Sequence, residues 1–299
     1  MRLPSDLRRL RLIVAAGLAT AGTACADLFP APIGGAPTGP PCHGTTLAQR
    51  LDCRPAGTIR VATYNASLNR ATPGELRRDL ATREDPQAQT IAAVIRRVRP
   101  DVLLINEFDY DAAGASARLF ARHYLESRAT GEALPALPLP YRLSAQVNTG
   151  LRSGADLDHD GRTDSDGGDA LGFGAFPGQY GMVVYSRFPL DRRRLRTFQN
   201  LRWASLPGAA WSPGWYPPEV HARLPLSSKS HWDIPLTLPG GRRLHLLASH
   251  PTPPVFDGAE DRNGRRNHDE IRLWAEYLAP VSYTHLRAHE TKANLVCRL

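Results

Sequence analysis

The sequence predicts an α/β fold in which helices cover a mixed arrangement of β-strands. Residues 59–65 form an alternating, β-branched run, and residues 101–107 form an apolar run that would be buried on both faces. A helical pattern lies between them, over residues 85–99. Strand, helix and strand in this order predict two parallel strands joined by a right-handed crossover.

The predicted helix has signals at both ends. Asp85 can cap its first turn, Pro86 suits the first helical position, and Pro100 ends it. Apolar residues recur at the spacing of one buried helical face, namely Ile91, Val94, Ile95 and Val98. The pattern predicts that this face packs on the sheet.

Three further elements follow in the sequence. Residues 182–185 and 244–249 are apolar runs that predict strands, and prolines directly after His250 stop the second run. Residues 265–278 predict a last helix. Its inner face is expected to carry Ile271, Trp274, Ala275 and Leu278.

Composition and charge narrow the function classes. The chain has 299 residues, and its 42% hydrophobic and 22% charged residues suit a globular protein. Residues 1–26 carry a net charge of +3 and residues 281–299 carry +2, which leaves +3 of the total +8 for the rest. This remainder is weak evidence for a polyanionic partner. We expect a monomer with no transmembrane segment after signal removal.

The first 26 residues have the pattern of a signal peptide. Arginines precede an apolar run over residues 12–19, and Ala24-Cys25-Ala26 supplies a small-x-small cleavage site. The mature chain would then begin at Asp27 and be secreted or periplasmic. A lipoprotein with Cys25 lipidated is the alternative, but Gly22 stands where a large aliphatic residue is normal.

Residues 27–57 form a leader rich in proline and glycine. Cys42 and Cys53 lie at a short spacing within it, which predicts a disulfide in an oxidising compartment. The alternative is two unpaired surface thiols.

Three predicted strands end in polar residues that suit phosphoryl chemistry: Asn65, Glu107 and His250. Parallel strands bring Asn65 and Glu107 to one rim. Magnesium prefers oxygen ligands and is often held by one or two carboxylates, so Glu107 is the expected ligand and Asn65 its support. His250 could donate a hydrogen bond to a phosphate oxygen. Each residue alone is also an ordinary way to end a strand; the three together favour a site.

Four stretches resemble the successive motifs of the endonuclease/exonuclease/phosphatase superfamily, over about residues 58–280. They are "IRVATYN", "PDVLLINE", "QYGMVVYSRFPL" and "LHLLASH". The resemblance implies a four-layer sandwich of two mixed β-sheets flanked by helices. It also implies that Glu107 and Asn65 lie at the metal, that His250 binds phosphate, and, as a looser match, that Tyr180 contacts the scissile phosphate.

The late motifs of that superfamily are missing from the sequence. An Asp-x-Asn motif that activates water and a terminal Asp-His pair are expected after residue 280, but residues 281–299 read "VSYTHLRAHETKANLVCRL". This tail looks non-native, and the C-terminal part of the domain is expected to be missing. The expectation is therefore an inactive or poorly folded chain whose full-length parent is active.

An acidic insert over residues 154–170 resembles a calcium loop. Asp156, Asp158, Asp160 and Asp164 follow the calcium-loop spacing, and Gly161 stands at the sharp turn. Gly167 replaces the usual glutamate, with Asp166 or Asp169 as substitutes. A structural Ca²⁺ is the interpretation, and a solvated acidic turn is the alternative.

Arg262, Arg266 and Asn267 follow His250 closely and are the candidate substrate contacts, although arginine-rich runs are usually solvated. The whole pattern predicts an exported phosphoesterase that uses Mg²⁺ or Mn²⁺ to hydrolyse a phosphodiester or phosphomonoester. A secreted nuclease acting on DNA or RNA is one alternative. A non-catalytic, calcium-stabilised binding protein on the same fold is the other.

Overall fold

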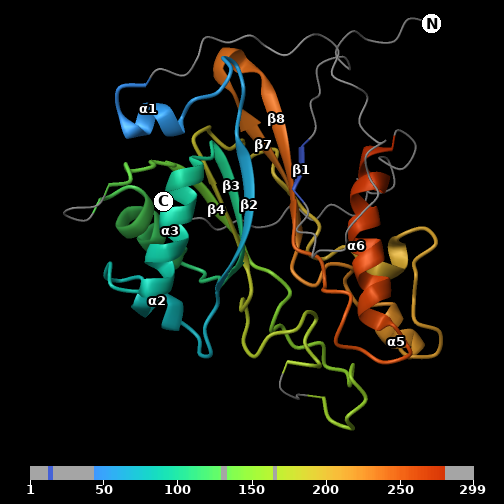
Figure 1. Ribbon diagram of the computed structural model, residues 1–299. Helices are drawn as coiled ribbons and strands as arrows, with labels where there is room; N and C mark the ends of the chain where they lie inside the picture. The colour runs from blue at the N-terminus through green and yellow to red at the C-terminus, as the bar shows by residue number, and fades with distance from the viewer. Residues whose placement is uncertain (1–12, 16–43, 129–132, 164–166, 280–299) are drawn as a thin grey trace, which may run out of the picture.

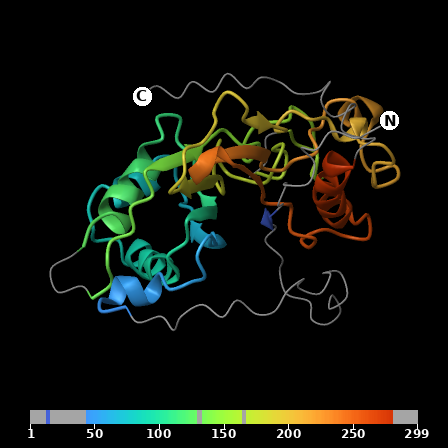
Figure 2. The ribbon, with the colours of Figure 1, turned by 90° about the horizontal axis from the view of Figure 1, so that it is seen from above.

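The computed structural model describes residues 13–15, 44–128, 133–163 and 167–279. Two four-stranded sheets pack face to face, with helices on both outer surfaces (Figures 1 and 2). This confirms the four-layer α/β sandwich that the resemblance implies. Residues 280–299, where the late motifs were sought, lie outside the described residues.

The first sheet has the strand order β2-β3-β5-β4. Strands β2 (Val61–Leu68) and β3 (Val102–Phe108) are parallel, as predicted, and helix α3 (Pro86–Val98) connects them. Strand β5 (Met182–Ser186) runs antiparallel to both β3 and β4 (Tyr141–Ser144). The sheet is therefore mixed, and the carboxyl ends of β2 and β3 meet at one rim.

The second sheet has the order β1-β8-β7-β6. Strands β8 (Arg243–Ser249), β7 (His231–Thr237) and β6 (Arg196–Thr197) are antiparallel neighbours. Strand β1 (Ile13–Ala15) pairs in parallel with β8. The residues of β1 come from the apolar run of the expected signal peptide, whose other residues lie outside the described part.

Alternating side chains of β3 build two cores. Val102 and Leu104 face the second sheet and pack with Ile234 of β7 and Leu246 of β8. Leu103 of β3 points the opposite way, into the core under α3 and its neighbouring helices. A third core lies between the second sheet and α6 (Arg262–Leu278). The remaining helices are α1 (Leu47–Leu51), α2 (Glu75–Asp79), α4 (Ala115–Phe120), α5 (Pro218–His221), the π-helix η2 (Ala121–Leu125) and the 3₁₀-helices η3 (Trp203–Ser205) and η4 (Pro239–Gly241).

Helix α3 begins as predicted, but only part of the predicted face, Ile91 and Ile95, is buried. The carboxylate of Asp85 accepts a hydrogen bond from the Ala88 amide at 2.7 Å, and Pro86 occupies the first turn. The buried residues are Ala88, Ile91, Ala92, Ile95 and Arg96, whereas Val94 and Val98 are exposed. The prediction overlooked the two alanines, whose small side chains let the helix lie close to the sheet.

Helix α6 also buries a face that apolar spacing did not predict. Trp274 is buried, but Ile271, Ala275 and Leu278 are exposed. The inner face instead holds two carboxylates and three other side chains, namely Asp269, Glu270, Leu273, Trp274 and Tyr277. The prediction failed here because a buried carboxylate interrupts the apolar period when hydrogen-bond donors surround it.

The described part of the leader contains Cys53, which is disulfide-bonded. Its predicted partner, Cys42, lies outside the described residues. Within the described ranges, no helix combines the length and the apolar character needed to cross a bilayer.

Candidate active site

The three predicted strand-end residues meet at one rim of the sandwich. Asn65 lies opposite Asn106 in the parallel pairing of β2 with β3, so the neighbouring Glu107 comes within reach. Asn65 Nδ2 donates to Glu107 Oε1 at 2.6 Å. His250, directly after β8 in the other sheet, places Nε2 at 3.6 Å from the same oxygen. The rim therefore joins both sheets around one carboxylate.

Local backbone geometry gathers further donors around Glu107. Ser67 and Glu107 have φ values of 47° and 59°, a left-handed conformation that residues with side chains seldom adopt. The pairing of β2 with β3 shifts register between Asn65 and Leu68. As a result, Ser67 Oγ and Asn69 Nδ2 lie 3.2 Å and 3.4 Å from Glu107 Oε2. Such outliers cluster at functional sites.

These neighbours keep Glu107 ionised. Its pKa is lowered to about 2, chiefly by His250, with Asn65 and Ser67 contributing, while partial burial acts in the opposite direction. Burial lowers the pKa of His250; the adjacent Glu107 opposes this shift, and the positive charge of Lys229 adds to it. The site thus pairs a stable carboxylate with an imidazole that favours its neutral form.

Lys229 adds a cation that the sequence reasoning missed. Its side chain is 8% exposed, and its ammonium group has no hydrogen-bond or ion-pair partner among the described residues. Burial lowers its pKa, and the negative charges of Glu270 and Glu107 oppose that shift. A buried ammonium group without a direct partner is unfavourable, and a bound anion would offset this cost.

Glu270 of α6 fixes the two segments that carry Lys229 and His250. Its carboxylate is fully buried and accepts hydrogen bonds from the Ser228 amide at 2.7 Å, the Ser228 hydroxyl at 3.0 Å and the Thr252 amide at 2.5 Å. Ser228 precedes Lys229, and Thr252 follows His250 by two residues. One carboxylate therefore holds both segments in place across the ends of β7 and β8.

Tyr180 is held at the rim by Asp109. The Tyr180 amide donates to Asp109 Oδ1 at 3.1 Å, and the Arg70 amide donates to Oδ2 at 2.8 Å. Burial raises the pKa of Asp109 to about 6, and the two amides partly offset this. Burial also raises the pKa of Tyr180, and the negative charges of Glu107 and Asp109 add to that shift.

The chemistry of these donors fits a hard divalent cation. Glu107 supplies a carboxylate that is charged at neutral pH, and the Asn65 and Asn69 amide groups and the Ser67 hydroxyl donate hydrogen bonds to it. Magnesium needs only one or two protein carboxylates when substrate phosphate and water complete its coordination. The residue that could hold a metal here is Glu107, and Asn65 and Asn69 would orient its carboxylate.

The three candidate substrate residues on α6 make other contacts. Arg266 donates to the backbone oxygens of Leu226, Leu171 and Pro225 at 2.9, 2.7 and 3.0 Å. Arg262 pairs with Glu260 at 2.5 Å and lies over the Trp215 ring. Asn267 Nδ2 donates to the Thr252 oxygen at 2.7 Å, which supports the segment after His250.

The acidic insert forms a second cluster. One carboxylate oxygen each from Asp156, Asp158 and Asp169 lies within 4.8 Å of the others. Asp156 Oδ1 is buried without a hydrogen-bond partner, and a side chain on Gly168 would clash with Asp158. Asp160 is exposed and outside this group, and Asp164 lies outside the described residues. Three neighbouring carboxylates, one of which has an oxygen without a hydrogen-bond partner, could bind a divalent cation.

Comparison with known proteins identifies a family for most of the chain. Residues 62–275 match the model of the Endonuclease/Exonuclease/phosphatase family. Among solved structures, the chain is similar to the crystal structure of endonuclease/exonuclease/phosphatase from Beutenbergia cavernae DSM 12333, with 20% identity and a TM-score of 0.36. The match covers 72% of this chain and 43% of that one, so this chain spans less than half of its length. No curated protein matches the chain.

Proposed function

The chain belongs to the Endonuclease/Exonuclease/phosphatase family, and from this premise we propose that it is a divalent-metal-dependent phosphoesterase. Family membership supports a hydrolase of phosphate-ester bonds. The observation that carries the finer proposal is the ionised carboxylate of Glu107, which has Asn65 and His250 within 2.6 Å and 3.6 Å. The substrate is a phosphodiester or a phosphomonoester.

Each residue of the rim has a role in this proposal. Glu107, supported by Asn65 and Asn69, would hold Mg²⁺ or Mn²⁺, which supplies charge stabilisation for the phosphoryl oxygens when bound. His250 donates a hydrogen bond to a non-bridging oxygen, and Lys229 supplies positive charge beside it. The Tyr180 hydroxyl contacts the same phosphate. These groups position the phosphate and offset the charge that develops as the reaction proceeds.

The reaction is direct hydrolysis. A water oxygen forms the new bond to phosphorus, the bond to the ester oxygen breaks, and the departing oxygen takes up a proton. The resemblance implies that the aspartate of a late Asp-x-Asn motif removes the proton from water.

Two further features belong to the proposal. The N-terminal pattern and the disulfide-bonded Cys53 favour a secreted or periplasmic protein. The cluster of Asp156, Asp158 and Asp169 is proposed to bind a structural Ca²⁺ that orders the acidic insert. Extracellular calcium sites commonly bind Ca²⁺ weakly, and they are filled because Ca²⁺ is abundant outside the cell.

A phosphatase and phosphodiesterase screen tests the proposed activity. The screen uses a form of the protein that carries the Asp-x-Asn and Asp-His motifs which the resemblance implies. We expect this form to hydrolyse p-nitrophenyl phosphate or bis(p-nitrophenyl) phosphate with Mg²⁺, and to lose this activity with chelator or with Glu107→Gln. Metal-independent hydrolysis, or full activity of the Glu107→Gln variant, would refute the proposal.

A further inference from the structure

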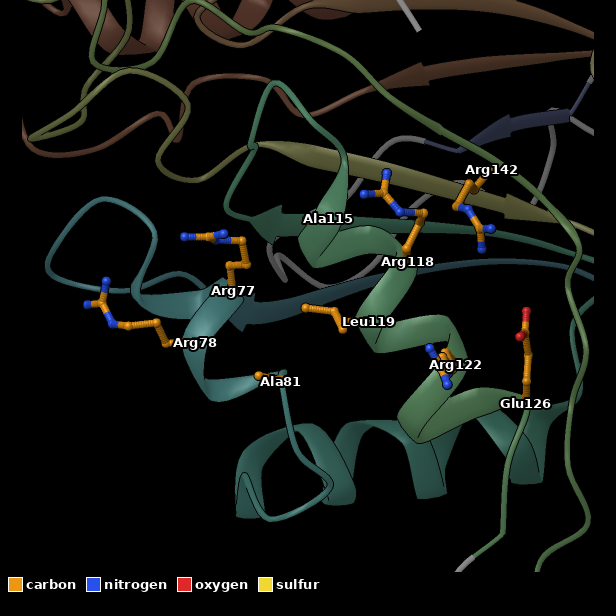
Figure 3. A pocket seen from close by; sticks show the side chains of 9 residues that line it. All are labelled: Arg77, Arg78, Ala81, Ala115, Arg118, Leu119, Arg122, Glu126 and Arg142. Atoms are coloured by element: carbon orange, nitrogen blue, oxygen red, sulfur yellow. The ribbon is translucent and has the colours of Figure 1, made fainter. Parts of the chain in front are cut away.

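A strongly cationic cleft lies outside the site described above, among α2, α4, η2 and β4. It has a volume of about 570 Å³ and is lined by the side chains of Arg77, Arg78, Arg118, Arg122 and Arg142, with Glu126 at one end (Figure 3). Arg77 and Arg78 extend from α2, Arg118 and Arg122 from α4 and η2, and Arg142 from β4. Five guanidinium groups from four elements thus line one cleft.

The five guanidinium groups have no carboxylate partner in the part of the chain that the structure describes. No described carboxylate lies within ion-pair distance of these side chains, Glu126 included. One nitrogen of the Arg118 guanidinium donates a hydrogen bond to the Ala113 oxygen. Most of the five N–H groups of this guanidinium therefore stay available to bind a ligand. Uncompensated like charges repel one another, and a bound anion would relieve this repulsion.

The cleft has two walls, α2 on one side and α4 with η2 on the other. The segment before each wall is bound close to the active-site rim. The chain enters α2 from Arg70, whose amide is bonded to Asp109, and it enters α4 from Asp111, which caps that helix through the Ala115 and Ser116 amides. Asp109 follows Glu107 by two residues. The segments that lead into both helices are therefore fixed close in sequence to the carboxylate at the rim.

The cleft also extends away from the rim. Arg142 pairs with Tyr185 on β5, and Tyr185 pairs with Leu103 on β3, four positions before Glu107. At roughly 3.3 Å per residue, this places Arg142 about 13 Å back from Glu107 along the sheet. A nucleic-acid strand carries one phosphate about every 3.4 Å of helix axis, so this length corresponds to about four nucleotides rather than to one phosphate.

The lining has the chemistry of backbone recognition. Between the arginines lie only small or aliphatic side chains, Ala81, Ala115 and Leu119. The lining holds no aromatic ring to stack on a base, and Leu119 is its single large apolar side chain, too little to anchor the protein in a membrane. Arginine forms paired hydrogen bonds with phosphate oxygens, independent of base sequence.

We infer that this cleft, the arginine cleft, binds the phosphodiester backbone of a nucleic acid whose scissile phosphate lies at Glu107 and His250. The inference rests on the proposed function and names its substrate class. It predicts a nuclease with little sequence preference.

Binding measured without catalysis tests the inference separately from the activity. Fluorescence anisotropy of labelled duplex and single-stranded DNA and RNA is followed in chelator at several salt concentrations, with the printed chain. The variant Arg77→Gln/Arg122→Gln removes one charge from each wall, and neither side chain has a hydrogen-bond partner among the described residues. The control Arg242→Gln/Arg243→Gln removes two exposed charges at the opposite end of β8.

We expect the cleft variant to bind nucleic acid about tenfold or more weakly, since charge-assisted contacts are lost. The dependence of log affinity on log salt should fall by about two, one for each lost phosphate contact. The control variant should bind like the unmodified chain. Equal loss in both variants, or no loss in either, would overturn the inference. Binding to anionic vesicles or inorganic tripolyphosphate but not to nucleic acid would also overturn it, whatever the outcome of the hydrolysis screen.

Discussion

Glu107 Oε1 lies 3.6 Å from His250 Nε2, although the two residues follow strands of different sheets. The contact forms where the ends of β3 and β8 face each other across the core between the sheets. The two side chains therefore link the two sheets at the rim. A cation and a phosphate could be bound together at this point, because a carboxylate and a hydrogen-bond donor are both present.

Glu270 is predicted to be essential for the geometry of the rim. Glu270→Gln would turn an amide group toward the backbone amides of Ser228 and Thr252 and leave at least one of them unsatisfied. We expect a loss of about 2–4 kcal/mol in the free energy of unfolding, measured by urea denaturation. Glu219→Gln, at an exposed position on α5, is the matched control and should change stability by less than about 0.5 kcal/mol. Equal stability of the two variants would contradict this role of Glu270.

Asp109 is predicted to make stability depend on pH. Its folded pKa of about 6 lies above the ordinary value of 3.8, so the folded state favours the protonated form. The contribution of Asp109 is therefore fully present below about pH 4 and is lost as the pH rises through about 6. Asp109→Asn cannot titrate. The difference in unfolding free energy between the unmodified chain and the variant should shrink from pH 4 to pH 7; a constant difference would contradict the prediction.

The acidic insert provides a test in which sequence and structure disagree. The calcium-loop spacing predicts Asp160 as a ligand, whereas the structure brings Asp169 to Asp156 and Asp158. We expect Ca²⁺ to raise the melting temperature of the unmodified chain and of Asp160→Asn, because a ligand that binds only the folded state stabilises it. Asp169→Asn should lose the effect. If Ca²⁺ still raises the melting temperature of Asp169→Asn but not that of Asp160→Asn, the ligand set predicted from the loop spacing is the correct one. If Ca²⁺ does not raise the melting temperature of the unmodified chain, the proposed calcium site is refuted.

The order of strands and helices could be predicted from the sequence because it depends on local signals. Strand β2, helix α3 and strand β3 each carry their own apolar pattern, and chain order makes the strands parallel. The strand ends at Asn65 and Glu107 follow from that pairing. The residues alone favoured one site for Glu107 and His250, because both stand at strand ends. The packing of two sheets that brings them into contact was implied only by the resemblance.

The residues that the sequence did not reveal act through contacts between distant parts of the chain. Glu270 and Ser228 are 42 positions apart, and a charged residue in a helix looks solvated until its partners are known. Lys229 lies in a polar turn before β7, where only its burial distinguishes it from a surface lysine. The arginine cleft likewise exists only because α2, α4 and β4 come together in space.

The central claim is that Glu107 holds a divalent cation, and Mn²⁺ binding to the printed chain tests it most directly. Binding is measured by the loss of the free-ion electron paramagnetic resonance signal, in an Asp169→Asn background that removes the acidic insert as a second site. The account predicts one bound Mn²⁺, lost in Glu107→Gln and retained in the matched Glu219→Gln variant. Equal Mn²⁺ binding with and without the Glu107 carboxylate would contradict it.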